Sequence, residues 1–240
     1  MTDLPATPAA SAEEQRGDSL RRVVFRRLFA AIPDFLLAGT FLLTWIDPYA
    51  LGQDALRFCM MTMILEFIIM HSSLFIGSCI YAREDAVQRF RNAVGFALIY
   101  TAMAAGVAIA FQRWWPVLAF GSLMLTRVLG VLTGDTPSTY KEDYMRAGWG
   151  LSVLYYMGGF FVTTILPIPI PELGVAAEVR HALDFPAEGF WVDEPQEMLA
   201  FGVIYFGLSG VGELYGRYER HWDVNWRESD NDGSGSDVVE

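Results

Sequence analysis

Apolar residues along the chain gather into six long blocks that polar segments separate. The blocks cover approximately residues 28–46, 57–81, 93–111, 115–133, 147–167 and 197–216. Each block has close to the roughly 20 residues that a helix needs to cross a hydrocarbon core of about 30 Å. Strands of a transmembrane barrel are only about 10 residues long and alternate in polarity, unlike these continuous blocks. The pattern therefore predicts an all-α integral membrane protein, built as a six-helix transmembrane bundle.

The composition agrees with this class of protein. Hydrophobic residues make up 53% of the 240 residues, and the 22 glycines are not counted in that share. Soluble domains reach about 45–50% only when glycine is included. Most of the polar connections between the blocks are short, which favours antiparallel packing of neighbouring helices.

The basic residues predict how the bundle lies in the membrane. Cytoplasmic loops attract Lys and Arg, and most of the 17 basic residues fall on one side of the predicted spans. That side carries Arg16, Arg21, Arg22, Arg26, Arg27, Arg83, Arg89, Arg91, Lys141, Arg146, Arg217, Arg220 and Arg227, whereas Arg57, Arg113 and Arg180 lie on the other. We therefore expect a multi-pass protein of a bacterial cytoplasmic (inner) membrane, with both termini in the cytoplasm.

Polar sequence is concentrated in two tails and one loop. We expect a disordered N-terminal tail over 1–20 and an acidic cytoplasmic tail over 217–240, on either side of a six-span transmembrane domain, 21–216. The extracytoplasmic loop, 168–196, is also acidic. Its PIPIP start should be extended because proline disfavours helix, and residues 171–184 then show a short helical pattern.

These segments and the membrane surface define the expected partners. The net charge of −11 comes mainly from the tails and the loop, and a basic face for nucleic acid is absent from the sequence. We expect membrane lipids as partners, and a protein partner either at the 168–196 loop or through helix faces of small residues, which permit close helix contact. Such faces occur at Gly212-x-x-x-Gly216 and at Ala102-x-x-x-Gly106-x-x-x-Ala110.

The sequence predicts no cofactor and no metal site. Cys59 and Cys79 lie on one predicted helix, about 30 Å apart by its rise per residue, and cannot form a disulfide with each other. A zinc site needs three or four His, Cys or acidic ligands. The spans offer few such ligands, and the positive charge of Arg127 inside a span disfavours a bound cation.

Ionisable residues inside the spans are the candidate functional residues. A charge at membrane depth costs several kcal/mol and is a functional hypothesis by default. At about 1.5 Å of rise per residue, five such residues fall in one layer in the inner half of the membrane. They are Asp34, Glu66, His71, Arg127 and Glu213. If their helices face one another, these residues form a buried polar cluster.

Arg127 is the residue of this cluster that most needs a partner. Its guanidinium stays protonated and requires acceptors, so we expect it to pair with Glu66 or Asp34. Glu66 and His71 are five residues apart and so about 140° apart around a helix. We therefore expect them to face different neighbours, with nearby serines bonding the backbone or an adjacent helix.

Three of the candidates also have simpler interpretations. Asp34 follows Pro33, and a proline with an acid beside it is typical of a helix start. Glu213 can pair with Arg217 one turn further on. His71 can be a neutral histidine that one hydrogen bond satisfies, rather than a proton relay or a ligand.

No motif in the sequence specifies a reaction, and no catalytic residue can be named. The function that fits best is a non-enzymatic membrane component, or a subunit of a complex, that handles a small solute or a proton through the Glu/Arg/His layer. Two alternatives stay open. One is an intramembrane enzyme for a lipid-soluble substrate, with Glu66 and His71 as acid–base groups. The other is a purely structural cluster that fixes helix register.

Overall fold

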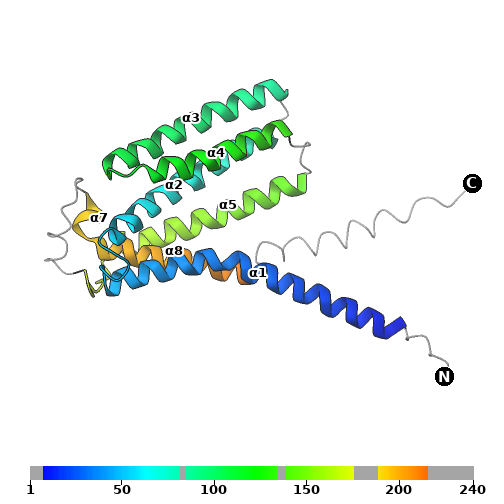
Figure 1. The fold of residues 1–240 in the computed structure, drawn as a ribbon, viewed down its shortest axis with the longest axis horizontal. Coiled ribbons are helices and arrows are strands. Elements are labelled where there is room, and N and C mark those ends of the chain that lie inside the picture. Colours follow the sequence, from blue (N-terminus) through cyan, green and yellow to red (C-terminus); the bar gives the residue numbers. More distant parts are fainter. Residues whose placement is uncertain (1–7, 82–84, 134–138, 176–188, 216–240) are drawn as a thin grey trace, which may run out of the picture. The chain divides into compact units, whose positions relative to one another are not determined.

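The regular structure of the protein is helical throughout the described residues. The computed structural model describes residues 8–81, 85–133, 139–175 and 189–215. Its elements are α1 (Pro8–Ile46), α2 (Ala55–Tyr81), α3 (Ala86–Ala110), α4 (Trp115–Thr133), α5 (Thr139–Phe160), the π-helix η1 (Phe161–Ile165), α7 (Phe190–Asp193) and α8 (Pro195–Tyr215), shown in Figure 1. The predicted all-α class is confirmed.

Four helices of the described chain are long and apolar enough to cross a membrane. They are Arg21–Ile46, Ala55–Cys79, Ala86–Ala110 and Pro195–Tyr215. Trp115–Leu129 is a shorter apolar helix. Helices of this kind indicate a membrane protein with several spans. The number of six spans and their orientation in the membrane remain predictions. The first helix is longer than its predicted span: α1 begins at Pro8 and so includes residues for which we expected disorder.

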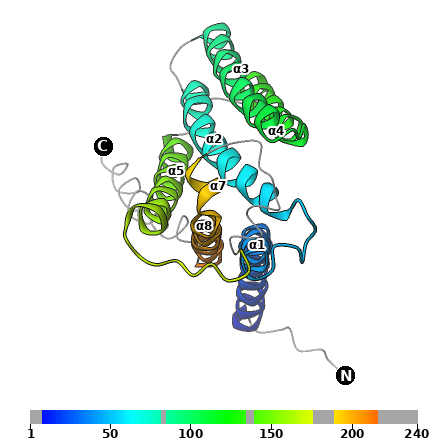
Figure 2. The ribbon, with the colours of Figure 1, turned by 90° about the vertical axis from the view of Figure 1, so that its left-hand side faces the viewer.

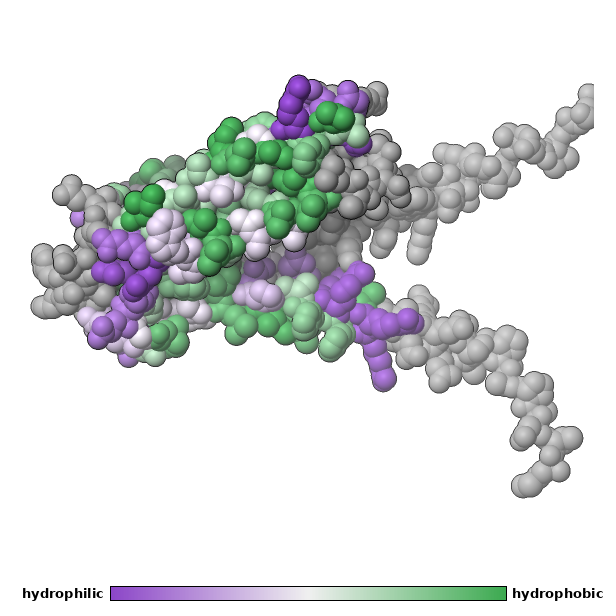
Figure 3. Space-filling view, turned by 45° about the horizontal axis from the view of Figure 1, so that its top comes forward, coloured by the Kyte–Doolittle hydropathy of each residue, from purple (hydrophilic) through white to green (hydrophobic). Residues whose placement is uncertain are grey.

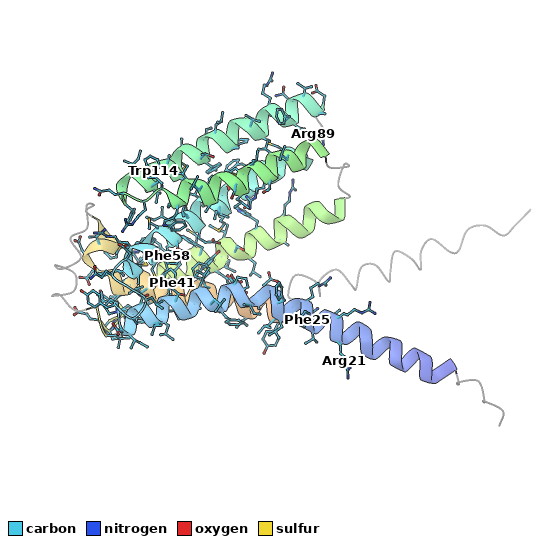
Figure 4. The ribbon with its side chains drawn as sticks, viewed as in Figure 1. Arg21, Phe25, Phe41, Phe58, Arg89 and Trp114 are labelled. Carbon is cyan, nitrogen blue, oxygen red and sulfur yellow. The ribbon has the colours of Figure 1, made fainter. Side chains whose placement is uncertain are left out.

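The chain divides into two compact units. The first unit takes Met1–Leu36 and Leu208–Glu240, and the second takes Leu37–Gly207. In the first unit, α1 exposes aromatic side chains beside arginines, as Figure 4 shows for Arg21 and Phe25. Phe25 and Phe29 are 70% and 69% exposed, and their rings stack 6.5 Å apart. A contiguous apolar surface of this kind is rare on a soluble protein and is typical of contact with lipid or another protein.

In the second unit, α2 is the central helix. It packs against α3, α4 and α5, and α3 and α4 form an antiparallel pair beside it, as Figures 1 and 2 both show. Two groups of buried side chains hold these helices together. One group joins α2 to α3 and α4 through Ile68, Ile76, Ala93, Tyr100, Phe120 and Met124. The other joins α2 to α1, α5 and α8 through Phe41, Met60, Met63, Tyr156, Phe201 and Tyr205.

Local sequence sets the limits of the α3–α4 hairpin. Asp85 caps α3, because its Oδ1 accepts a hydrogen bond of 2.8 Å from the backbone N–H of Gln88. The turn between the two helices contains Gln112 at φ 54°, and Pro116 lies in the first turn of α4, where its missing N–H is tolerated. Figure 4 places Arg89 and Trp114 at opposite ends of this hairpin.

The face of the second unit that Figure 3 shows is mostly hydrophobic between the helix ends, where hydrophilic side chains gather. Leu98 of α3 and Leu118 of α4 are 66% and 73% exposed. At one end, Asp54 accepts a hydrogen bond from Arg113 and lies 3.8 Å from Arg57. This distribution fits helices that present apolar side chains to lipid and charges to water.

The chain that follows η1 is extended, as the PIPIP sequence predicted. Leu166 has φ −73° and ψ 139°, and residues 167–172 contain no helix. This segment is tied to the end of α1: the Trp45 side-chain N–H donates to the Pro171 carbonyl at 2.9 Å, and the Gly174 N–H donates to the Trp45 carbonyl at 3.0 Å. Residues 176–188, which hold most of the predicted helical segment of the loop, lie outside the described residues.

The contact between Gly202 of α8 and Phe41 of α1 provides a test of this packing. A Cβ atom added at Gly202 would lie 2.0 Å from the Phe41 ring, which is fully buried and packs on Phe206. We expect Gly202→Ala to lower the free energy of unfolding by about 1–3 kcal/mol, the usual cost of overpacking. Thermal unfolding in detergent measures this change.

Gly207→Ala is the matched control on the same helix. A Cβ atom at Gly207 meets no atom within 4 Å, and alanine is the better helix former. Its unfolding midpoint should equal or exceed that of the parent protein. If Gly202→Ala and Gly207→Ala were equally stable, α8 would not approach α1 as closely as described.

Candidate functional site

Helix α2 carries several polar side chains within the second unit. It runs for 27 residues without a proline, and its apolar sequence contains Glu66, His71, Ser72 and Ser73 in its middle. Polar groups in an apolar environment are stable only when they are hydrogen-bonded. The partners of these groups therefore define what the site can do.

Glu66 is held by a tyrosine from another helix. The Tyr205 hydroxyl of α8 donates a hydrogen bond of 2.7 Å to Glu66 Oε1. Tyr205 is buried, whereas Glu66 is partly buried. Among the described residues, the other carboxylate oxygen, Oε2, has no hydrogen-bond partner. A carboxylate can accept about four hydrogen bonds, so Glu66 keeps an acceptor that a proton or a solute can use.

Arg127 of α4 binds α2 through serines rather than through an acid. Its Nη1 donates to Ser73 Oγ at 2.7 Å and, more weakly, to Ser72 Oγ at 3.4 Å. Each hydroxyl in turn donates to the Ile69 carbonyl. The guanidinium is thus bonded to neutral acceptors that are themselves satisfied.

The ion pair expected between Arg127 and Glu66 is not direct in the described residues. The two charges attract each other across the bundle, but no hydrogen bond joins them. The reason lies in the register of α2. Ser73 follows Glu66 by seven residues, so it lies on the same face of the helix and about 10 Å further along the axis. The long arginine side chain contacts the serines at that level.

His71 bonds to its own helix. Its Nδ1 lies 2.8 Å from the Phe67 carbonyl oxygen, and the two rings lie 4.0 Å apart. Because a carbonyl only accepts, Nδ1 carries the hydrogen of this bond. Nε2 has no hydrogen-bond partner in the part of the chain that the structure describes. Glu66 therefore bonds to another helix and His71 to its own, and the two residues share no partner.

Two aromatic donors of α5 complete the site. The Tyr156 hydroxyl donates to the Met63 carbonyl at 2.9 Å, and the Trp149 N–H donates to the Met70 carbonyl at 3.1 Å. The two donors are seven residues apart on α5, and the two acceptors are seven residues apart on α2. Seven residues make about two turns of each helix. Tyr156 also packs edge-on against Tyr205, with ring centroids 5.3 Å apart. Sequence reasoning missed Tyr205, Tyr156 and Trp149, although the seven-residue spacing of the last two was a usable signal.

The remaining two candidates belong to the first unit. Asp34 lies on α1, and Pro33 is inside that helix, which begins at Pro8. The interpretation of Asp34 as a helix-start residue is therefore wrong, because the helix continues through the proline. Glu213 lies on α8 and is partly buried, while its expected partner Arg217 lies outside the described residues. The layer of five ionisable residues stays a prediction.

Within the described residues, no group of three or more His, Cys, Asp or Glu side chains could hold a metal ion. Comparisons of the chain with protein-family models, with curated proteins and with solved structures gave no match. The fold and the site therefore define a class, an all-helical membrane protein with several spans and a polar cluster on its central helix. The function has to be argued from these residues.

The bond between Tyr205 and Glu66 can be measured with a double-mutant cycle. Tyr205→Phe removes only the hydroxyl, and Glu66→Gln removes the charge while keeping the shape. We expect the two residues to couple by about 1–2 kcal/mol, as a charge-assisted hydrogen bond between helices should. Chemical unfolding in detergent gives the four free energies. Tyr100→Phe is the control, because the Tyr100 ring is buried while its hydroxyl has no hydrogen-bond partner in the described residues. Additive effects of the two substitutions would contradict the bond.

Arg127→Met removes the guanidinium and keeps an apolar stem. We expect a lower yield of folded protein, because Ser72 and Ser73 lose their donor and Glu66 loses the attracting charge. The free energy of unfolding should fall by less than about 3–5 kcal/mol, which is the usual cost of breaking a direct buried ion pair. The additional substitution Glu66→Gln should restore part of the lost stability. Size-exclusion profiles and thermal midpoints report this. Arg113→Met, in the exposed turn between α3 and α4, is the control. An Arg127→Met protein of unchanged stability would contradict the role of Arg127.

Proposed function

We propose that the protein is a non-enzymatic component of a bacterial cytoplasmic membrane that handles a proton, or a small solute with hydrogen-bond donors, at Glu66. In this proposal the chain has six spans, formed by α1 to α5 and α8, with both termini in the cytoplasm. The support for six spans is that α4 and α5 cover the two further apolar blocks of the sequence. The support for the orientation is the one-sided distribution of arginines and lysines.

The observation that carries the proposal is the half-satisfied carboxylate of Glu66. Tyr205 fixes Oε1, and Oε2 lacks a hydrogen-bond partner among the described residues. A carboxylate fully paired with arginine would have no oxygen left for exchange. Here Arg127 supplies attraction from a distance, without occupying the group. Ionisable residues inside membrane spans typically mark proton or solute pathways.

His71 is the second group that can take part. Its Nε2 lacks a partner in the described residues, and neutral imidazole accepts a proton there. By helix geometry it lies about 7.5 Å along the axis from Glu66 and about 140° around it. Transfer between the two residues would therefore need a bridging water or solute. The same separation argues against the enzyme alternative, in which both groups act on one substrate atom.

A purely structural role is the second candidate, and one observation favours it. The polar groups of α2 bond to different neighbours: Glu66 to α8, Ser72 and Ser73 to α4, and the Met63 and Met70 carbonyls to α5. Such an arrangement fixes register without any transport. The two roles differ in what removal of the Glu66 charge does to flux when the fold is kept.

Protein partners remain part of the proposal. The α3 face formed by Ala102, Gly106 and Ala110 is exposed, and a Cβ atom at Gly106 would meet no atom within 4 Å. This face is available to lipid or to the helix of a complex partner.

Proton flux into liposomes tests the proposed function. Purified protein is reconstituted into vesicles that contain a pH-sensitive dye, and a potassium diffusion potential drives protons into the vesicles. We expect proton uptake above that of protein-free vesicles, and at least a tenfold loss in Glu66→Gln. Asp54→Asn makes the same change of charge at the exposed start of α2 and should keep the flux of the parent protein.

Two results would contradict this function. If vesicles with the parent protein take up protons no faster than protein-free vesicles, the protein does not handle protons. A Glu66→Gln protein that keeps full flux, with an unchanged size-exclusion profile, would leave Glu66 with the structural role only.

A further inference from the structure

A cavity of about 370 Å³ lies in the second unit, away from the Glu66 site. Its walls come from α2, from Phe111 just after α3, from the junction of α5 with η1, and from α7 with the glycine before it. The residues that matter most are Met60, Ile64, Phe160, Thr164, Phe190 and Trp191. None of the residues that line it is charged. Pockets for small molecules have volumes of about 300–1,000 Å³, and this cavity lies within that range. One water molecule takes up only about 30 Å³.

Two residues that line this cavity each hold a buried polar atom without a partner. Neither the Thr164 hydroxyl nor the Trp191 side-chain N–H has a hydrogen bond to any described residue. An unsatisfied buried polar group is costly, and native structures rarely keep one without a reason. Both groups belong to residues that line the same cavity, so a molecule bound there is in contact with both residues.

The local structure explains why Thr164 lies at the cavity. The π-helical turn η1 follows α5 directly, and the Leu166 N–H closes it on the Phe161 carbonyl at 3.0 Å. Single π-helical turns are frequent at functional sites. Gly159, just before this turn, lets α8 approach: a Cβ atom there would lie 2.8 Å from the Phe201 ring. Trp191 packs on the same rings, with its centroid 6.1 Å from Phe160 and 5.9 Å from Phe201.

The chemistry of the two unpartnered groups selects the ligand. The tryptophan N–H only donates, whereas the threonine hydroxyl donates or accepts. A ligand atom shared by both must therefore be an acceptor. The uncharged walls favour a neutral molecule whose remainder is apolar. Phe190, which lines the cavity, is 52% exposed, so the cavity lies close to the surface of the protein.

We propose that this cavity binds a neutral amphiphile whose hydrogen-bond-accepting oxygen lies between Thr164 and Trp191 and whose apolar part contacts Met60, Ile64 and Phe160. The carbonyl oxygen of a membrane quinone and that of a fatty-acyl ester share this chemistry. The inference does not rest on the function proposed for Glu66.

Binding of three probes with the same alkyl chain tests the proposal on the full-length protein in detergent. Decylbenzoquinone and decyl acetate carry acceptor oxygens, whereas decylbenzene carries none. The rise of the unfolding midpoint with probe concentration gives apparent dissociation constants. We expect saturable binding of at least one acceptor probe, about five- to tenfold tighter than that of decylbenzene. Binding of decylbenzoquinone alone identifies a quinone-like ligand, and binding of decyl acetate alone identifies an ester-like one.

Variants locate the site. Thr164→Val and Trp191→Phe should each weaken binding of the acceptor probe to the level of decylbenzene, and Thr164→Ser should restore it. Thr126→Val and Trp114→Phe make the same chemical changes at exposed positions and should leave binding unchanged. The inference is overturned if no probe saturates, if decylbenzene binds as tightly as the acceptor probes, or if Thr164→Val and Trp191→Phe bind like the parent protein.

Discussion

The hydrogen bond from Tyr205 to Glu66 is the interaction on which the interior of the second unit depends. A carboxylate in the middle of a long apolar helix has no water to solvate it, so a side chain of another helix must do so. This requirement brings α8 against α2 at one defined height. The Tyr205 ring then packs edge-on against Tyr156, whose hydroxyl bonds to α2 three residues before Glu66. One partly buried acid thereby sets the register of α2 with both α5 and α8.

The same constraint separates two places on α2 with different chemistry. Ile64 and Glu66 are two residues apart, so they point about 200° apart around the helix. Ile64 contributes to an apolar cavity, whereas Glu66 belongs to the polar cluster. The rings of Phe160, which lines the cavity, Phe201 and Tyr205 are neighbours, with successive centroids 6.2 and 6.3 Å apart. A chain of neighbouring aromatic rings therefore runs from the cavity to the residue that bonds Glu66.

The sequence predicted the helical class and, apart from the first half of α1, the approximate position of the long helices in the described residues, because blocks of apolar residues at membrane length have few other solutions. It also placed Glu66 and His71 on different sides of α2, since that depends only on helical geometry. The partner of Arg127 was not predictable in this way. It depends on the heights of α2 and α4 relative to each other, and a shift of two turns replaces a carboxylate by two serines. Tyr205, Thr164 and Trp191 look like ordinary apolar-span and loop residues until the packing around them is known.

The central claim is that Glu66 lies inside an apolar bundle with one oxygen fixed and the other open to exchange. Labelling with a hydrophobic carbodiimide, followed by peptide mass spectrometry, tests this directly, because the reagent dissolves in the apolar phase and modifies carboxyl groups that it can reach there. The account predicts one adduct at Glu66 in the parent protein, and faster labelling in Tyr205→Phe, where both oxygens are released. An unlabelled Glu66, in a protein whose other carboxyl groups react, would contradict it.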